Sequence, residues 1–559
     1  MASRIAAGLA LLLLQLVACS APIRPYSTKP IVWKDDDERP FEKKPEVYLS
    51  PLIWNGTDHL IFLPMSNALS VKTGKESVDV NAVDEVPDSA WFTNRLSVGT
   101  MTPEEMARGS CRGESPELER PWTVTGAKFD GQTPGFTIRT KSGARYLLKF
   151  DDAKQPERAS AADVIGSKIY YAAGFTAPCN RVVFFDAADM VVPEKADAGS
   201  GGKQVTREYV DQLLGLVPRA PDGKLRAMAT ELLEGQPLGP WKYEGVRADD
   251  PNDIIPHEDR REVRATRVLG AWLNHYDHGE NNTLDMWIRV PAGGGYVKHD
   301  TLDWGDALGF LWDQDEISRR LGYSYYFDFG TTGRDFVTLG VVERPWDRAH
   351  LGKAGATLGY FNDEDFDPEE WHPGYPNTAF SRMTERDGAW MTRIVARFSN
   401  ADIEAMVAEG KLTDPVVRQE LVRILEGRRD RILQRWLSQL SSLTDVTLRA
   451  AGAGPELCVR DRAEEAGWPP APAPSARLWS SRRGGPEKLT VNRTEGSLCI
   501  PLPDGSGDYL VVDIVSGRPN QHPLRVHLRG DLPALAVVGV ERPNSDSDPG
   551  RLPPMGGGP

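Results

Sequence analysis

The 559-residue chain is poor in cysteine and in clustered basic charge. Five cysteines are too few for a disulfide scaffold of this length, and no Cys-x-x-Cys pair indicates structural zinc. The 66 Lys and Arg against 80 Asp and Glu give a net charge of −14, which argues against nucleic acid as a partner because phosphate binding needs clustered positive charge. Beyond the N-terminus no apolar run is long enough to span a bilayer. The remaining composition, 40% hydrophobic and 26% charged, is that of a globular protein.

The N-terminus has the features of an export signal. Residues 1–18 combine an early positive charge (Arg4), a short apolar run and small residues before Cys19. This pattern resembles the bacterial lipoprotein signal, in which the cysteine is lipidated and becomes the new N-terminus; a plain secretory signal with a chance cysteine is the alternative. Ser20 in place of aspartate resembles lipoproteins sent to the outer membrane. We therefore expect a lipid-anchored protein of the bacterial cell envelope, on its periplasmic or surface face.

Changes in composition divide the rest of the chain. We expect a Pro- and charge-rich tether at 19–50, an N-terminal extension packed on the core at 51–120, and a mixed α+β unit at 121–443. Period-2 apolar runs separated by turn residues predict a small β-sandwich-like module at 450–545, followed by a disordered tail at 546–559. Cys458 and Cys499 lie in strand-like contexts there, either as a disulfide or as two buried thiols.

The first chemical signal is a glycine-bearing turn followed by a strand lysine. Gly126 and Gly131 lie in or near the turn between two predicted strands, and Lys149 ends a third strand among apolar neighbours. A buried ammonium needs an anionic partner, unless its stem reaches out to water. Asp163, in the middle of the predicted helix that follows, is the expected partner, with Glu157 at the helix start as its rival. Kinase folds grip nucleotide phosphates with such a turn and lysine.

The second signal is a carboxylate and amide constellation further along the chain. Asn282 follows Asp277 by five positions, directly after a predicted helix. A predicted hairpin then leads into Asp303-Trp-Gly-Asp. In kinases an aspartate orients the attacking hydroxyl, an asparagine five residues later ligates a metal ion, and an Asp-aromatic-Gly motif supplies the second metal ligand.

Together these motifs resemble the protein-kinase-like superfold, in particular its atypical branches, the HipA-type serine kinases and the phosphatidylinositol kinases. The resemblance implies a bilobal fold with a β-rich N-lobe and a helical C-lobe. It also implies ATP with Mg²⁺ or Mn²⁺ as cofactors. Strand 229–235, with Glu231 and Leu233, would form the hinge that meets adenine.

The resemblance assigns roles to the motif residues. Lys149, held by Asp163, would grip the phosphates together with Gly126 and Gly131. Asn282 and Asp303 would hold the metal, and Asp277 would orient the acceptor hydroxyl. The acceptor stays open between a protein, a lipid headgroup, a glycan and a small molecule.

Two other interpretations compete with a kinase. His275, His278 and His299 lie near the same loop and, with Asp300 or Asp303, could bind zinc for a hydrolase. Alternatively, the kinase-like fold serves as a catalytically inactive binding or assembly lipoprotein, since a protein outside the cytoplasm meets little ATP.

Two amphipathic helices are expected to close the kinase-like unit, at 400–409 and 414–440. The apolar period of the second predicts that Arg428, Arg429, Arg431 and Arg435 face water.

Overall fold

The computed structural model describes residues 25–49, 56–69, 74–128, 135–194, 205–451, 454–481, 484–494, 496–503, 508–530 and 534–544. The predicted signal peptide 1–18, Cys19, Gly131 and the tail 546–559 lie outside these residues. Among the helices that are described, none combines the length and the apolar character needed to cross a membrane.

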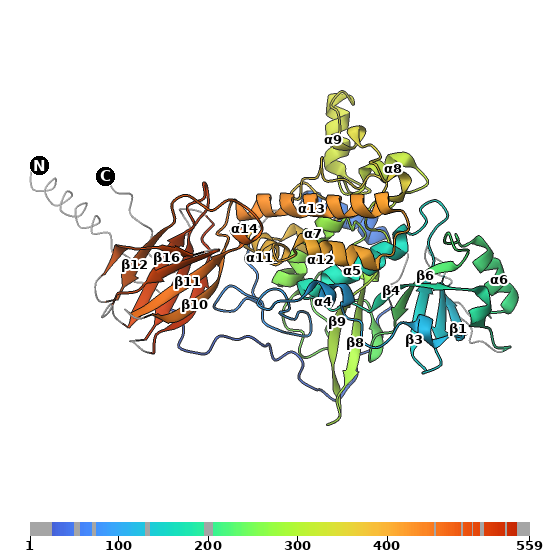
Figure 1. Ribbon diagram of the computed structural model, residues 1–559, viewed down its shortest axis with the longest axis horizontal. Coiled ribbons are helices and arrows are strands. Elements are labelled where there is room, and N and C mark those ends of the chain that lie inside the picture. Colours follow the sequence, from blue (N-terminus) through green and yellow to red (C-terminus); the bar gives the residue numbers. More distant parts are fainter. Residues whose placement is uncertain are drawn as a thin grey trace, which may run out of the picture.

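The N-lobe is one six-stranded sheet (Figure 1), antiparallel except where the short edge strand β5 pairs in parallel with β1. Its strand order is β4-β6-β3-β2-β1-β5, and the one long helix between β3 and β4 is α5. Alternating buried residues in the strands build a separate core of this lobe, which α6 covers. The elements are β1 (Trp122–Lys128), β2 (Gly135–Arg139), β3 (Arg145–Lys149), α5 (Arg158–Ala173), β4 (Asn180–Phe185), β5 (Met190–Val191), α6 (Arg207–Leu216) and β6 (Leu225–Glu231).

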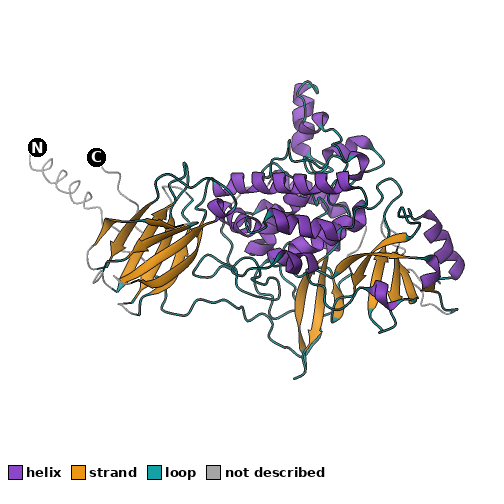
Figure 2. Cartoon of the chain, viewed as in Figure 1, coloured by secondary structure: helices purple, strands orange, loops and turns teal. Residues whose placement is uncertain are grey.

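The C-lobe is helical and carries a three-stranded sheet, β7-β8-β9, on the side of the N-lobe. Figure 2 shows the helices gathered in the centre of the molecule, between the strands of the two ends. The elements are β7 (Gln236–Gly239), α7 (Arg261–Leu273), β8 (Thr283–Arg289), β9 (Gly295–Thr301), α8 (Asp315–Arg320), α9 (Phe329–Thr338), α10 (Thr378–Ser381), α11 (Glu385–Val395), α12 (Asn400–Glu409) and α13 (Pro415–Leu437). Short 3-10 turns are η4 (His257–Asp259), η5 (Glu280–Asn282), η6 (Pro345–Arg348) and η7 (Gly355–Thr357).

The molecule is therefore an α+β protein with a bilobal kinase-like core, as the motif order predicts. Three features define this architecture: the meander of β1, β2 and β3, the helix α5 between β3 and β4, and a helical lobe that the chain enters through the β6–β7 connection. α5 packs on both lobes, because it contacts β4 and β6 on one side and α12 on the other. Residues on this helix are thus placed at the junction of the lobes.

The C-terminal module, residues 443–541, is a sandwich of two antiparallel sheets. Their facing apolar side chains form a core distinct from those of the two lobes. Cys458 and Cys499 are neighbours across β11 and β15 and are joined by a disulfide. The strands are β10 (Leu443–Ala451), β11 (Gly454–Asp461), β12 (Ser475–Ser480), β13 (Gly484–Leu489), β14 (Asn492–Thr494), β15 (Ser497–Pro501), β16 (Tyr509–Val515), β17 (Leu524–Arg529) and β18 (Ala536–Glu541), with a short helix α14 (Arg462–Glu465).

The chain before the N-lobe runs along the whole molecule. Tyr26 hydrogen-bonds the module through Tyr509, Phe41 pairs with Gly295, and Tyr48 with Leu238. The described part of the expected tether thus packs against folded units. Further on, residues 84–106 enter the core of the C-lobe. The helices here are the π-helix η1 (Asp58–Phe62), α3 (Leu63–Leu69) and α4 (Pro103–Arg108), followed by η2 (Pro116–Glu119).

One expectation for α13 is wrong. Arg428 and Arg429 do not face water but are buried. The guanidinium of Arg428 lies 3.5 Å from the ring centre of Phe366 and donates to the carbonyls of Ala271 and Trp272. Helical periodicity predicts which residues share a face, but not whether another segment covers that face. Here residues 361–366 fold back over the polar face of α13.

Candidate functional site

Lys149 lies at the end of β3 and points at two carboxylates from distant parts of the chain. Its Nζ is 2.8 Å from Oδ1 of Asp303 and 3.5 Å from Oδ2 of Asp163. Burial alone would lower the pKa of Lys149, but the two carboxylates outweigh it and raise that pKa. The lysine is therefore a fixed cation between the lobes and does not reach out to water.

The choice between Asp163 and Glu157 is decided by the start of α5. Glu157 accepts hydrogen bonds from the backbone N–H and hydroxyl of Thr413 and so faces away from Lys149. Asp163, six residues later on the buried face, uses Oδ2 for Lys149 and Oδ1 for the backbone N–H of Trp304. The helix acid thus holds both the lysine and the Asp-Trp-Gly turn.

The Asp303-Trp-Gly turn depends on two tight positions. Asp303 has a φ of 55°, a left-handed conformation that aspartate tolerates better than most side chains. Trp304 is fully buried, and its ring packs where Gly166 of α5 leaves room: a Cβ there would lie 2.4 Å from Cγ of Trp304. These contacts aim the carboxylate of Asp303 at the junction of the lobes.

The loop after α7 brings Asp277 and Asn282 to the same place. Asn274 ends the helix in the left-handed conformation, which redirects the chain. The Nδ2 group of Asn282 donates to the carbonyl of Asp277 (2.7 Å), and the carbonyl of Asn282 accepts from Leu302 N–H (2.9 Å). One backbone hydrogen bond, from Leu302 to Asn282, therefore joins the two motifs directly, one residue before Asp303.

Asp163, Asp277, Asp303 and Asp306 lie close enough to influence one another, with Lys149 and Arg158 as nearby cations. Burial raises the pKa of Asp163 to about 6 and also raises the pKa values of Asp277 and Asp306. Neighbouring carboxylates add to these shifts. Such a site favours binding of a further cation, which would offset the repulsion.

The fold comparisons return protein kinases. The Rio2 kinase-ADP/Mg2+-phosphoaspartate complex from Chaetomium thermophilum has 12% identity over 52% of this chain and 71% of its own, with a TM-score of 0.18. The golgi casein kinase has 10% identity over 66% and 96%, with a TM-score of 0.21. The twitchin kinase region from C. elegans has 11% identity over 81% and 78%, with a TM-score of 0.23. The sequence matches no family model and no curated protein.

Three further residues contribute to the site, and none of them has a role assigned from the sequence. Asp306 accepts the backbone N–H of Asp277 (3.0 Å). The hydroxyl of Tyr375 donates to Oδ1 of Asp277 (2.5 Å), and the ring of His59 stacks on that of Tyr375. Only Asp306, three residues after Asp303, lies close enough to a motif to have been suspected. Tyr375 and His59 come from segments without any motif.

Of the expected nucleotide-binding residues, Lys149 and Asp163 form the cluster, whereas Gly126, Glu231 and Leu233 lie in the N-lobe sheet and the connection that follows it. Gly126 forms a bulge in β1, where the register with β2 shifts. Glu231 ends β6, and half-buried Leu233 follows in the connection to β7, which joins the lobes. These positions suit a turn over the phosphates and a hinge.

The three histidines do not gather as metal ligands. Both ring nitrogens of His278 face tyrosine hydroxyls, those of Tyr170 and Tyr243, at 3.4 Å. Nδ1 of His299 lies 2.6 Å from Asp285. Burial lowers the pKa of His275 to about 4, and it remains neutral near Asp306. Within the described residues, the group with metal-ligand spacing is instead Glu456 with Cys458 and Cys499, whose sulfurs form the disulfide.

Proposed function

We propose that the chain is a kinase-like phosphotransferase of the cell envelope, anchored through a lipid on Cys19. It would transfer a phosphoryl group from a nucleotide to a hydroxyl acceptor, with Mg²⁺ or Mn²⁺. The observation that supports this most is the double contact of Lys149. Both the helix acid Asp163 and the motif aspartate Asp303 meet this lysine at the lobe junction.

The residues present fit a divalent cation. Carboxylate and amide oxygens are the hard donors that Mg²⁺ prefers, and Asp303 and Asn282 supply one of each. Burial, with the neighbouring carboxylates, raises the pKa values of Asp277 and Asp306, and a bound cation would lower them again. Asp303 and Asn282 would hold the ion, which would neutralise charge on the phosphates when bound.

The remaining side chains would position the reactants. Lys149 would hold nucleotide phosphates as a fixed cation, kept in place by Asp163. Asp277 would accept a hydrogen bond from the acceptor hydroxyl and align it for attack. One oxygen of Asp277 is already used by Tyr375, so the acceptor would use the other oxygen or displace the tyrosine.

A second candidate function is a binding module without catalysis. Two contacts favour it, because Asp303 is engaged by Lys149 and one oxygen of Asp277 by the hydroxyl of Tyr375, so both motif acids already have protein partners. In this case a nucleotide would bind without being turned over.

The test compares Asp303→Asn with Asp313→Asn. Asp313 is an exposed acid in the following loop, paired with Lys154, and its loss should change nothing in the site. We expect the wild type and Asp313→Asn to show metal-dependent nucleotide turnover and a raised melting temperature with nucleotide and Mg²⁺ or Mn²⁺. Asp303→Asn should lose turnover by about 100-fold or more.

Each outcome points to one interpretation. Unchanged turnover in Asp303→Asn would refute the proposed site. A nucleotide-dependent melting shift without turnover in the wild type would support the binding module. No shift and no turnover would exclude both functions.

A further inference from the structure

A helical finger projects from the C-lobe and exposes apolar side chains at its tip. The finger, residues 327–342, contains α9, which projects beyond α13 at the top of the molecule in Figure 1. Its tip is strongly exposed: Phe336 by 81%, Val337 by 80%, Leu339 by 87% and Val341 by 85%. No residue of α9 is buried by the described parts of the chain. Soluble proteins rarely expose so many large apolar groups together without a binding role.

A second segment beside the finger also exposes apolar side chains. η1 and α3 are remote from α9 in sequence, yet α3 packs beside α9. They expose Leu60, Ile61, Met65 and Leu69, the last by 83%. The exposed apolar side chains therefore come from two segments of the chain and not from one face of a single helix.

The chemistry of the patch fits hydrocarbon better than a protein partner. Residues 336–342, Phe-Val-Thr-Leu-Gly-Val-Val, carry no charge, and neither segment contains tryptophan or tyrosine. Protein interfaces draw their energy mainly from Trp, Tyr and Arg. Aliphatic and phenyl groups on a projecting tip instead suit insertion below lipid headgroups. With a net charge of −14, the chain has no electrostatic attraction to an anionic bilayer.

We propose that the finger and the η1–α3 segment insert into a lipid bilayer, as a contact separate from the lipid on Cys19. The start of the described chain supports this occupant. Tyr26 is hydrogen-bonded to the module, and Cys19 precedes Pro25 by six residues, which span at most about 21 Å. A lipid on Cys19 would hold the folded protein at the bilayer surface, where the exposed tip meets lipid.

The contact would also orient the candidate site. Leu60 and Ile61 directly follow His59, which stacks on Tyr375, and Tyr375 donates to Asp277. Insertion of this segment would turn the side of the site that holds Asp277 toward the membrane. The inference itself rests on the exposed surface and does not require phosphoryl transfer.

The test uses the mature chain from residue 20, made without export so that it carries no lipid. Flotation with vesicles of phosphatidylethanolamine and phosphatidylglycerol measures binding, without nucleotide. We expect the wild type to float with vesicles, at high salt as well, because the contact is hydrophobic. Phe336→Asp/Leu339→Asp should lower the bound fraction at least about tenfold.

The matched control is Leu216→Asp, which places the same charge at an equally exposed leucine, 81%, on α6 of the N-lobe. This variant should float like the wild type. All three proteins should melt alike, since the changed side chains are exposed. The proposal would be overturned if the wild type did not bind vesicles, or if Leu216→Asp lost as much vesicle binding as Phe336→Asp/Leu339→Asp. A wild-type dimer that the finger variant abolishes, without vesicle binding, would also overturn it and assign the patch to contact between copies.

Discussion

Gly166 shows how a single missing side chain controls the candidate site. It lies in α5, three residues after Asp163, against the buried ring of Trp304. In Gly166→Ala the new methyl group would collide with this ring, so Trp304 and the adjacent Asp303 must shift. We expect a loss of about 1–3 kcal/mol in unfolding free energy, measured by urea titration, together with weaker nucleotide-dependent thermal shifts.

Gly215→Ala is the matched control, since Gly215 is also helical and has no atom within 4 Å of an added Cβ. This change should leave the site intact and stabilise α6 by up to about 1 kcal/mol. Full stability and full nucleotide response in Gly166→Ala would contradict the packing argument.

Asp300, on β9, gives the protein a pH dependence of stability. Burial raises the pKa of its carboxyl to about 7, well above the ordinary value of an aspartate. The folded state therefore holds a proton that the unfolded state releases above about pH 4, and stability falls as the pH rises toward 7. Asp300→Asn replaces the carboxyl with a neutral amide and so removes the free-energy cost of ionising a buried acid in the folded state. We expect the variant to be more stable than the wild type by about 2–4 kcal/mol near pH 8 and by clearly less near pH 5.

Urea titrations near the two pH values measure the difference, with Asp36→Asn as a control at an exposed acid. A stabilisation of equal size at both pH values would show that burial does not shift this group.

At the scale of residues, spacing along the chain predicts only part of the site. Asp277, Asn282 and Asp303 lie in two short motifs, so their convergence requires just one hairpin between them. Tyr375 is 98 positions from Asp277, and its role depends on how residues 326–375 fold back on the loop. No local pattern encodes such a contact, since a lone tyrosine in an aromatic-rich stretch has many possible partners.

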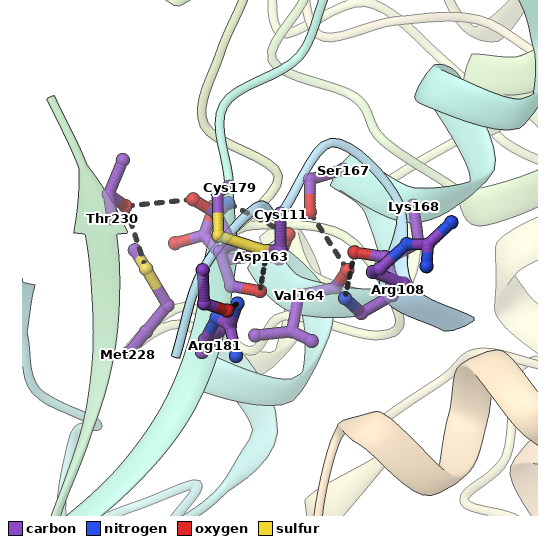
Figure 3. The surroundings of a disulfide bond; sticks show 12 residues. Arg108, Cys111, Asp163, Val164, Ser167, Lys168, Cys179, Arg181, Met228 and Thr230 are labelled. Atoms are coloured by element: carbon purple, nitrogen blue, oxygen red, sulfur yellow. Dashed lines mark hydrogen bonds between the residues drawn. A yellow bond between two sulfur atoms is a disulfide. The ribbon is translucent and has the colours of Figure 1, made fainter. Parts of the chain in front are cut away.

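At the scale of elements, α5 is braced by a disulfide that the sequence did not reveal. Cys111, after α4, and Cys179, before β4, are joined beside this helix (Figure 3). The neighbouring Asn180 donates to the carbonyl of Asp163. We expect Cys111→Ser/Cys179→Ser to lose about 4 kcal/mol of stability, as the loop of 68 residues predicts, and to weaken nucleotide-dependent thermal shifts.

The second disulfide provides the comparison. Cys458→Ser/Cys499→Ser removes a bond inside the module, on strands that do not contact α5. It should destabilise the module while leaving the nucleotide response unchanged. Equal nucleotide responses in both double variants would show that the bond at Cys111 does not position α5.

The elements themselves follow from periodicity where each has a buried face of its own. β1 to β3, α5, α12 and α13 appear where alternation or helical spacing predicts them. The pattern fails for the orientation of α13, because residues 361–366 cover the face that carries Arg428. It also gave no sign of α9, of which no residue is buried by the described parts of the chain.

At the scale of the whole molecule, one buried aspartate joins three units. Asp84 of the N-terminal extension lies 2.7 Å from Arg261 of α7, 3.4 Å from Arg393 of α11 and 3.0 Å from Arg542, which follows the last strand of the module. Burial would raise the pKa of Asp84, but the three guanidinium groups outweigh it and lower that pKa to about 2. The module is thus tied to the C-lobe by a charge that stays ionised at any ordinary pH.

Asp84→Asn should uncouple the module from the kinase-like core. Three buried arginines would lose their shared anion, at a cost of about 3–5 kcal/mol. We expect one calorimetric transition of the wild type to split into two, one for each unit. The stability that Asp84 contributes is present above about pH 4 and is lost as the pH falls through about 2, so the variant should lack this acid dependence.

Asp513→Asn breaks a buried pair with Arg525 inside the module. This control should lower the stability of the module without splitting the calorimetric transition. Two results would show that Asp84 does not couple the units: a split transition in Asp513→Asn, or a single unshifted transition in Asp84→Asn.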